Sequence, residues 1–160
     1  MGRASAIETS YAGCRFRSRL EARWAVVMDR LHLNWQYEAQ GFHLPSGNYL
    51  PDFTVDGVEK PFMIEIKGGM PDTREFEVAS EINLYVAPLV ILAGDIPRRR
   101  GEGTGWIFAS DEEGGEWSMT DPEKALIFGA TGEIGDTRIA NWEAAITAGR
   151  SARFEHGQSG

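Results

Sequence analysis

The feature that most constrains the fold is a run of five apolar residues, Leu89–Ala93. Such a run without alternation is typical of a strand that is buried on both faces. The segment before it, from Asp72 or Thr73 to about Val86, has the capping residue and the apolar spacing that predict a helix. Because parallel strands are joined through a crossover, we expect the 89–93 strand to run parallel to a neighbour across that helix. These segments predict the α/β class.

Other segments predict helices and strands around this pair. A helix is expected over 18–31, where apolar residues recur at helical spacing. Aromatic and β-branched residues predict strands at 35–44, 49–55 and 62–67, with a hairpin turn at 45–48 between the first two. A later hairpin is expected from 106–109 and 117–119, and a last helix over 139–153. The predicted architecture is a mixed central sheet with flanking helices in the order α-β-β-β-α-β, followed by a C-terminal hairpin and helix.

Composition is consistent with one folded unit. The chain has 160 residues, of which 42% are hydrophobic and 25% charged, which is typical of a single domain over 1–160. We expect a loose leader at 1–12 and a frayed tail at 155–160. The single cysteine, Cys14, excludes an intramolecular disulfide and a cysteine-based metal cluster, and favours a reducing, cytoplasmic location. A run of 18 apolar residues is absent, so no membrane partner is expected.

Three charged residues on two predicted strands indicate chemistry. Asp52 lies at the start of one strand, and Glu65 and Lys67 lie on the next. Because strand side chains alternate, Glu65 and Lys67 point to one face and Ile64 and Ile66 to the other. Carboxylates hold Mg²⁺, which keeps waters that can attack phosphorus. A lysine beside the metal can orient that water or offset charge that builds on a phosphate.

These residues carry a resemblance to a known superfamily. Pro51-Asp52 followed by Glu65-Ile66-Lys67, after Glu21 in the first helix, resembles the PD-(D/E)xK nucleases, particularly the endonuclease modules of transposition systems and of phage and mobile-element nucleases. The resemblance covers about residues 11–95. It implies a restriction-endonuclease-like core, with nucleic acid, DNA foremost, as the substrate. It also implies a Mg²⁺ or Mn²⁺ site made by Asp52, Glu65, the Ile66 carbonyl and Glu21, with Lys67 aiding the attack of water.

Charge gives a mixed indication about nucleic acid. The formal net charge is −8, whereas phosphate binding favours a basic face. Arg17, Arg19 and Arg23 cluster at the first helix and are the candidate nucleic-acid-binding residues. Each is equally well explained as a solvated surface charge. A protein partner or a second copy of the chain could supply a basic face that this chain lacks.

Each candidate site residue also has an ordinary structural explanation. Ser18 and Glu21 have the spacing of a capping box, and Arg17 and Glu21 that of a surface ion pair. Asp52 follows a proline, as turn residues often do, and Pro51 within a strand indicates an edge or a bulge. Glu65 and Lys67 could form the solvated face of a half-buried strand. A non-catalytic nucleic-acid-binding or protein-interaction module on the same fold is therefore the alternative function.

A glycine-rich stretch near the C-terminus resembles a different motif. The stretch that contains Gly129, Gly132 and Gly135 resembles the glycine fingerprint of dinucleotide-binding folds. That mechanism requires a helix and a second strand after the glycines. The residues after Gly135 contain no apolar strand run, so we predict a glycine-rich loop before the last helix instead.

Overall fold

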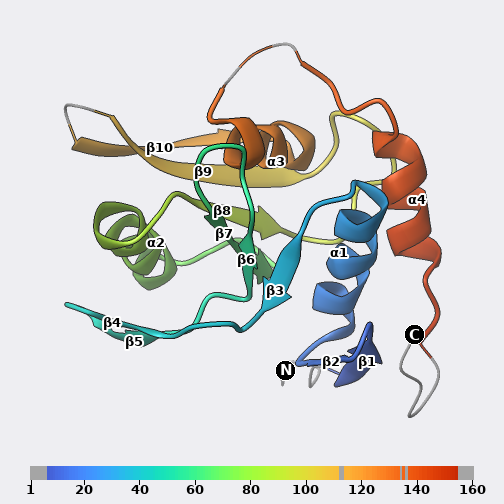
Figure 1. Cartoon of the computed structure of the whole chain (residues 1–160), viewed down its shortest axis with the longest axis horizontal. Helices are drawn as coiled ribbons and strands as arrows, with labels where there is room; N and C mark the ends of the chain where they lie inside the picture. The colour runs from blue at the N-terminus through green and yellow to red at the C-terminus, as the bar shows by residue number, and fades with distance from the viewer. Residues whose placement is uncertain (1–6, 112–113, 134, 136, 155–160) are drawn as a thin grey trace.

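The computed structural model describes residues 7–111, 114–133, 135 and 137–154 (Figure 1). Within these residues it shows an α/β protein with four helices, a six-stranded mixed sheet and two small hairpins. The sheet order is β10-β9-β8-β7-β6-β3, and only β7 and β8 are parallel neighbours. Its strands are β3 (Trp35–Tyr37), β6 (Phe53–Val55), β7 (Phe62–Lys67), β8 (Leu89–Ala93), β9 (Thr104–Asp111) and β10 (Gly114–Thr120).

The parallel pair at the centre of the sheet confirms the prediction made from the apolar run. Every residue of β8 is buried, and the register places Ile64 of β7 opposite Val90 of β8. The crossover between the two strands contains α2 (Thr73–Tyr85), which buries Ala79 and Ile82. Two consecutive strand segments and the helix between them therefore fold as their sequence patterns predict.

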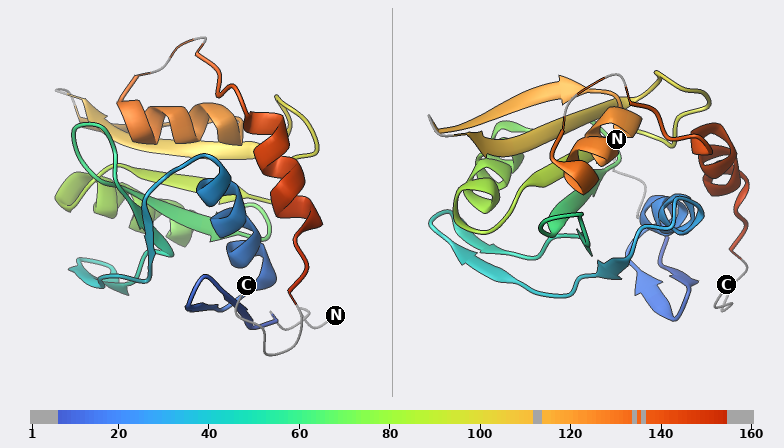
Figure 2. Two further views of the ribbon diagram at one scale, coloured as in Figure 1. Left: turned by 45° about the vertical axis from the view of Figure 1, so that its right-hand side comes forward. Right: turned by 45° about the horizontal axis from the view of Figure 1, so that its top comes forward.

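Helices cover the two faces of the sheet unequally (Figure 2). One hydrophobic core joins the sheet to α1 (Arg19–Arg30), α3 (Pro122–Thr131) and α4 (Trp142–Ser151). The second core, on the other face, contains the buried residues of α2. Side chains that alternate along β7 contribute to both cores, because Ile64 packs in the first core and Met63 in the second. None of the described helices is long and apolar enough to cross a membrane.

The predicted continuous strands at 35–44 and 49–55 are wrong. The chain leaves the sheet after β3, and a separate hairpin forms from β4 (Phe42–Leu44) and β5 (Gly47–Tyr49) before β6 begins. Glu38 adopts a left-handed conformation with φ 46°, which ends β3. Pro51 lacks the amide that a strand interior requires. The consequence is a protruding arm between β3 and β6.

The predicted loose leader is also partly wrong. Residues 9–11 form β1 (Thr9–Tyr11), which pairs with β2 (Cys14–Phe16) in an antiparallel hairpin. Its turn has left-handed conformations at Ala12, with φ 50°, and Gly13, with φ 78°. Positive φ at both central residues suits a tight two-residue hairpin turn. Residues 1–6 and the predicted tail at 155–160 lie outside the described residues.

The predicted glycine-rich loop is partly wrong, because α3 includes Gly129, and only Gly132 and Gly135 lie in the segment between α3 and the last helix. Asp121 caps the helix by accepting the amide of Lys124 at 3.0 Å, and Gly132 ends it with φ 77°. Gly129 allows α3 to approach the sheet, since a Cβ there would lie 2.4 Å from a ring carbon of Phe62. The glycines therefore serve packing and helix termination.

The last helix, predicted over 139–153, is shorter, and the predicted C-terminal hairpin forms as β9 and β10 at the sheet edge.

Candidate functional site

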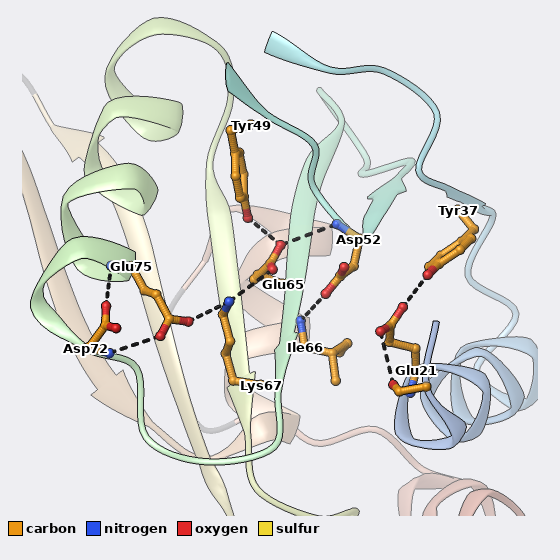
Figure 3. A network of polar contacts seen from close by, with 10 residues as sticks. Glu21, Tyr37, Tyr49, Asp52, Glu65, Ile66, Lys67, Asp72 and Glu75 are labelled. Atoms are coloured by element: carbon orange, nitrogen blue, oxygen red, sulfur yellow. Dashed lines mark hydrogen bonds and ion pairs between the residues drawn. The ribbon is translucent and has the colours of Figure 1, made fainter. Parts of the chain in front are cut away.

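The predicted acids meet where β6 starts and β7 ends (Figure 3). These strands are antiparallel, and the pairing of Phe53 with Ile64 places Asp52 beside Glu65. The Ile66 amide donates to Asp52 Oδ2 at 2.7 Å, and the Asp52 amide lies 3.4 Å from Glu65 Oε2. The residues Asp52 and Glu65 are only 9% and 8% exposed. Backbone hydrogen bonds between the two strands thus orient both carboxylates.

Glu65 and Lys67 face α2, as the alternation along β7 predicts. The Tyr49 hydroxyl, from the hairpin arm, donates to Glu65 Oε2. Lys67 Nζ lies 3.3 Å from Glu65 Oε1 and 2.5 Å from Glu75 Oε2 of α2. The Lys67 side chain is 28% exposed. The explanation of these residues as a fully solvated strand face therefore does not hold.

A cavity of about 210 Å³ adjoins Glu65 and Lys67. Asn48 and Tyr49 of the arm line this cavity, together with residues 74, 75, 78 and 79 of α2. A larger cavity of about 400 Å³ lies at the opposite ends of β7 and β8, beside Pro61 and Pro88. Its lining includes a single carboxylate, so the smaller cavity is the better candidate for acid-dependent chemistry.

Glu21 lies on the first turn of α1 and is 8% exposed. Ser18 Oγ accepts the Glu21 amide at 3.1 Å, which is half of the predicted capping box. The carboxylate, however, accepts the Ser18 hydroxyl at 3.0 Å instead of its amide, and it also accepts the Tyr37 hydroxyl. Arg17 pairs with Glu38 at 2.6 Å, so the predicted Arg17–Glu21 ion pair is wrong.

The charges of the site are incompletely balanced. Burial, followed by the negative charges of Glu65 and Glu21, raises the pKa of Asp52 to about 8. Burial also raises the pKa of Glu65, although Tyr49 and Lys67 oppose the shift. Burial acts to lower the pKa of Lys67, but Glu75 and Glu65 outweigh it and the pKa is raised. Lys67 is therefore a stable cation beside two carboxylates that are costly to ionise.

The types of donor at the site, although not their present arrangement, suit a hard divalent cation. Carboxylate and carbonyl oxygens are the ligands that Mg²⁺ and Mn²⁺ prefer, and excess buried negative charge favours their binding. Across the described ranges, no three His, Cys, Asp or Glu side chains are arranged closely enough to hold a metal. Glu21, Asp52 and Glu65 instead point to separate hydrogen-bond partners.

The candidate nucleic-acid-binding arginines are not gathered at the acids. Arg17 is held by Glu38. Arg19 lies two residues before Glu21 and Arg23 two residues after it. A separation of two residues is a rotation of about 200° around a helix. Gly149 of α4 packs against the backbone of Arg23, since a Cβ at 149 would lie 3.0 Å from the Arg23 carbonyl oxygen. The two arginines thus project from a different face of α1 than Glu21.

Three residues of the site were not identified from the sequence. Tyr49 and Tyr37 bond the acids Glu65 and Glu21, and neither belongs to a short motif. For Glu75 the sequence does contain a pattern, because Asp72 and Glu75 have capping-box spacing at the start of a predicted helix. That signal predicts the helix start, whereas the contact with Lys67 depends on the packing of α2 on β7.

Comparisons of the chain with models of protein families, with curated proteins and with solved structures found no match. The residues of the site and their geometry are therefore what indicates a function for this chain.

Proposed function

We propose that the chain is a metal-dependent nuclease of the PD-(D/E)xK type, which hydrolyses phosphodiester bonds of nucleic acid, DNA foremost. The observation that carries the proposal is the buried pair Asp52 and Glu65, oriented by backbone amides, with Lys67 Nζ 3.3 Å from Glu65. Paired carboxylates with an adjacent lysine are the groups that metal-assisted attack on a phosphodiester requires.

The arrangement of elements supports the same proposal. The order α1, β3, β6, β7, α2, β8 agrees with the restriction-endonuclease-like core that the resemblance implies, with the β4–β5 arm inserted after β3. β6 and β7 are antiparallel, and β7 and β8 are parallel across α2. Asp52 and Glu65 lie side by side near the C-terminal end of β7, and Glu65 and Lys67 line the cavity beside α2.

Asp52, Glu65 and the Ile66 carbonyl would hold Mg²⁺ or Mn²⁺, and Glu21 would complete the site. The bound cation would lower the pKa of a water and neutralise phosphate charge. The Ile66 amide keeps Asp52 oriented, and Tyr49 does the same for Glu65. Because burial and Glu65 raise the pKa of Tyr49, its hydroxyl keeps the proton that it donates. Lys67 stabilises negative charge on the scissile phosphate.

A non-catalytic nucleic-acid-binding or protein-interaction module on this fold is the second candidate. The absence of a three-acid metal cluster among the described residues, together with the net charge of −8, favours it. A protein partner or a homodimer would then supply the basic surface that binding to phosphates requires.

One experiment separates the two functions. Purified protein is incubated with Mg²⁺, Mn²⁺ or a chelator on labelled single- and double-stranded DNA and RNA. We expect cleavage that requires metal, falls to background in Glu65→Ala, and falls about 10²–10³-fold in Lys67→Ala. Equal cleavage by Glu65→Ala would indicate a contaminant, and binding without cleavage in any metal would favour the second candidate.

A further inference from the structure

The first turn of α2 makes a direct contact with the candidate catalytic lysine (Figure 3). Glu75 Oε2 lies 2.5 Å from Lys67 Nζ, which is closer than the 3.3 Å between Lys67 Nζ and Glu65 Oε1. Lys67 and Glu75 are both about seven-tenths buried, at 28% and 29% exposure. Partial burial strengthens an ion pair relative to one at the surface. Glu75 is therefore the main partner of the lysine.

The same carboxylate is fixed by the start of its helix. Glu75 Oε1 accepts the Asp72 amide at 3.3 Å, and Asp72 Oδ1 accepts the Glu75 amide at 2.8 Å. This reciprocal capping box leaves the second oxygen of Glu75 for Lys67. A lysine side chain has four rotatable carbon bonds, so an unpaired ammonium would sample many positions. Two carboxylates from different elements, β7 and α2, restrict it to one.

We propose that Glu75 is a positioning residue, which holds the Lys67 ammonium beside Glu65 so that it meets the scissile phosphate in one place. The inference rests on the proposed nuclease function and adds to it a residue outside the Asp-Glu-Lys set. The packing of α2 on the sheet then determines where the catalytic charge lies. Misplacing a catalytic group by about 1 Å can cost about 10²-fold in rate.

Glu75→Gln separates the two tasks of this side chain. Glutamine also serves at the third position of a capping box, so the start of α2 should persist. It lacks the negative charge that pairs with Lys67. The matched control is Glu77→Gln, which removes one carboxylate from an exposed position of the same helix. Circular dichroism and the melting temperature verify that both variants fold.

The position of the lysine can be measured without metal or nucleic acid. The chain contains only three lysines, Lys60, Lys67 and Lys124, and the other two are exposed. We expect NMR order parameters of the lysine ammonium groups, at one fixed pH, to show a restricted Lys67 in the wild type. In Glu75→Gln the Lys67 value should fall to that of Lys60 and Lys124, and in Glu77→Gln it should not change.

Kinetics test the consequence for cleavage. In Glu75→Gln we expect kcat to fall about 10- to 100-fold, while KM for the nucleic acid stays within about twofold. An unchanged kcat, or a restricted Lys67 in the variant, would overturn the proposal. If the wild type cleaves nothing but its Lys67 is restricted by Glu75, the proposed function fails while the contact stands.

Discussion

The buried carboxylates among the described residues are Glu21, Asp52, Glu65 and Glu123, and they differ in how their charge is compensated. Glu123 accepts two hydrogen bonds from Arg100 Nε and one from the Ile139 amide. Glu65 is paired with Lys67, whereas Asp52 accepts the Ile66 amide and Glu21 accepts the hydroxyls of Ser18 and Tyr37, so neither of these two has a cation as its partner. Because burying uncompensated charge costs free energy, this second arrangement is better explained by function than by stability.

Glu21→Gln tests the residue with the strongest alternative explanation. Glutamine can accept the Ser18 and Tyr37 hydroxyls, so folding and melting temperature should be close to those of the wild type. It removes the charge that a hard cation binds, and we expect metal-dependent cleavage to fall by at least tenfold. Cleavage rate against Mn²⁺ concentration is the measurement. Wild-type rates in this variant would restrict the site to Asp52, Glu65 and Lys67.

The raised pKa of Asp52 predicts that the stability of the metal-free protein, measured in chelator, depends on pH. Its pKa is about 8 in the folded protein and near 4 in an unfolded chain, so between these values only the folded state binds this proton. The favourable contribution is complete below about pH 4 and is lost as the pH rises through 8. Asp52→Asn, which does not titrate, should therefore gain stability relative to the wild type from pH 5 to pH 9, by about 4 kcal/mol. Urea unfolding at both pH values measures the difference. A pH-independent difference would show that Asp52 titrates normally.

At the scale of elements, local sequence patterns predicted those helices and strands that residues close together in the sequence determine. The strands β7 and β8 and the helices α1 and α2 follow from apolar spacing and capping residues. The turn of the β4–β5 hairpin was predicted from its Pro, Ser, Gly and Asn residues, but the break between β3 and β4 was not, because the left-handed Glu38 that ends β3 has no strong sequence signal. Likewise, Gly129 indicated a loop, whereas its actual role is contact between α3 and Phe62.

In the site, strand alternation predicted that Glu65 and Lys67 share a face, and the structure confirms it. The resemblance implied that Glu21, Asp52 and Glu65 converge on one metal, whereas the described residues contain no such cluster of three acids. The contacts of Lys67 with Glu75 and of Glu65 with Tyr49 could not be predicted, because they join elements that only the tertiary packing brings together.

Gly149→Ala tests whether close packing of α4 on α1 outweighs helix propensity. In an exposed helix, this change stabilises by about 1 kcal/mol. Here the new Cβ would lie 2.5 Å from Val27 Cγ2 and 3.0 Å from the Arg23 carbonyl oxygen. Overpacking of this kind costs about 1–3 kcal/mol, so we expect net destabilisation in urea unfolding. The control Ala144→Gly, at an exposed position of α4, should lose about 1 kcal/mol from propensity alone. A stabilised Gly149→Ala protein would show that the helices separate at little cost.

At the scale of the whole molecule, the distribution of charge bears on how the proposed nucleic-acid substrate would be bound. The net charge of −8 opposes approach to a polyanion, and the acids at the end of β7 add to that repulsion. Neutralisation of these acids by a cation would therefore assist both chemistry and binding. The folded chain should accordingly bind divalent metal more tightly than the unfolded chain does.

Metal should raise the melting temperature of the wild type. A ligand that binds only the folded state stabilises by about 2.7 kcal/mol at a hundred times its Kd, which corresponds to a rise of about 5–10 °C for a chain of this size. Because protons compete for Asp52, whose pKa is about 8, the rise in Mn²⁺ should be larger at pH 8.5 than at pH 6. Asp52→Asn should abolish the rise, whereas Glu59→Gln, at an exposed position before β7, should keep it. Scanning calorimetry with Mn²⁺ and with chelator gives the comparison. An equal rise in Asp52→Asn would place the metal elsewhere and remove Asp52 from the proposed site.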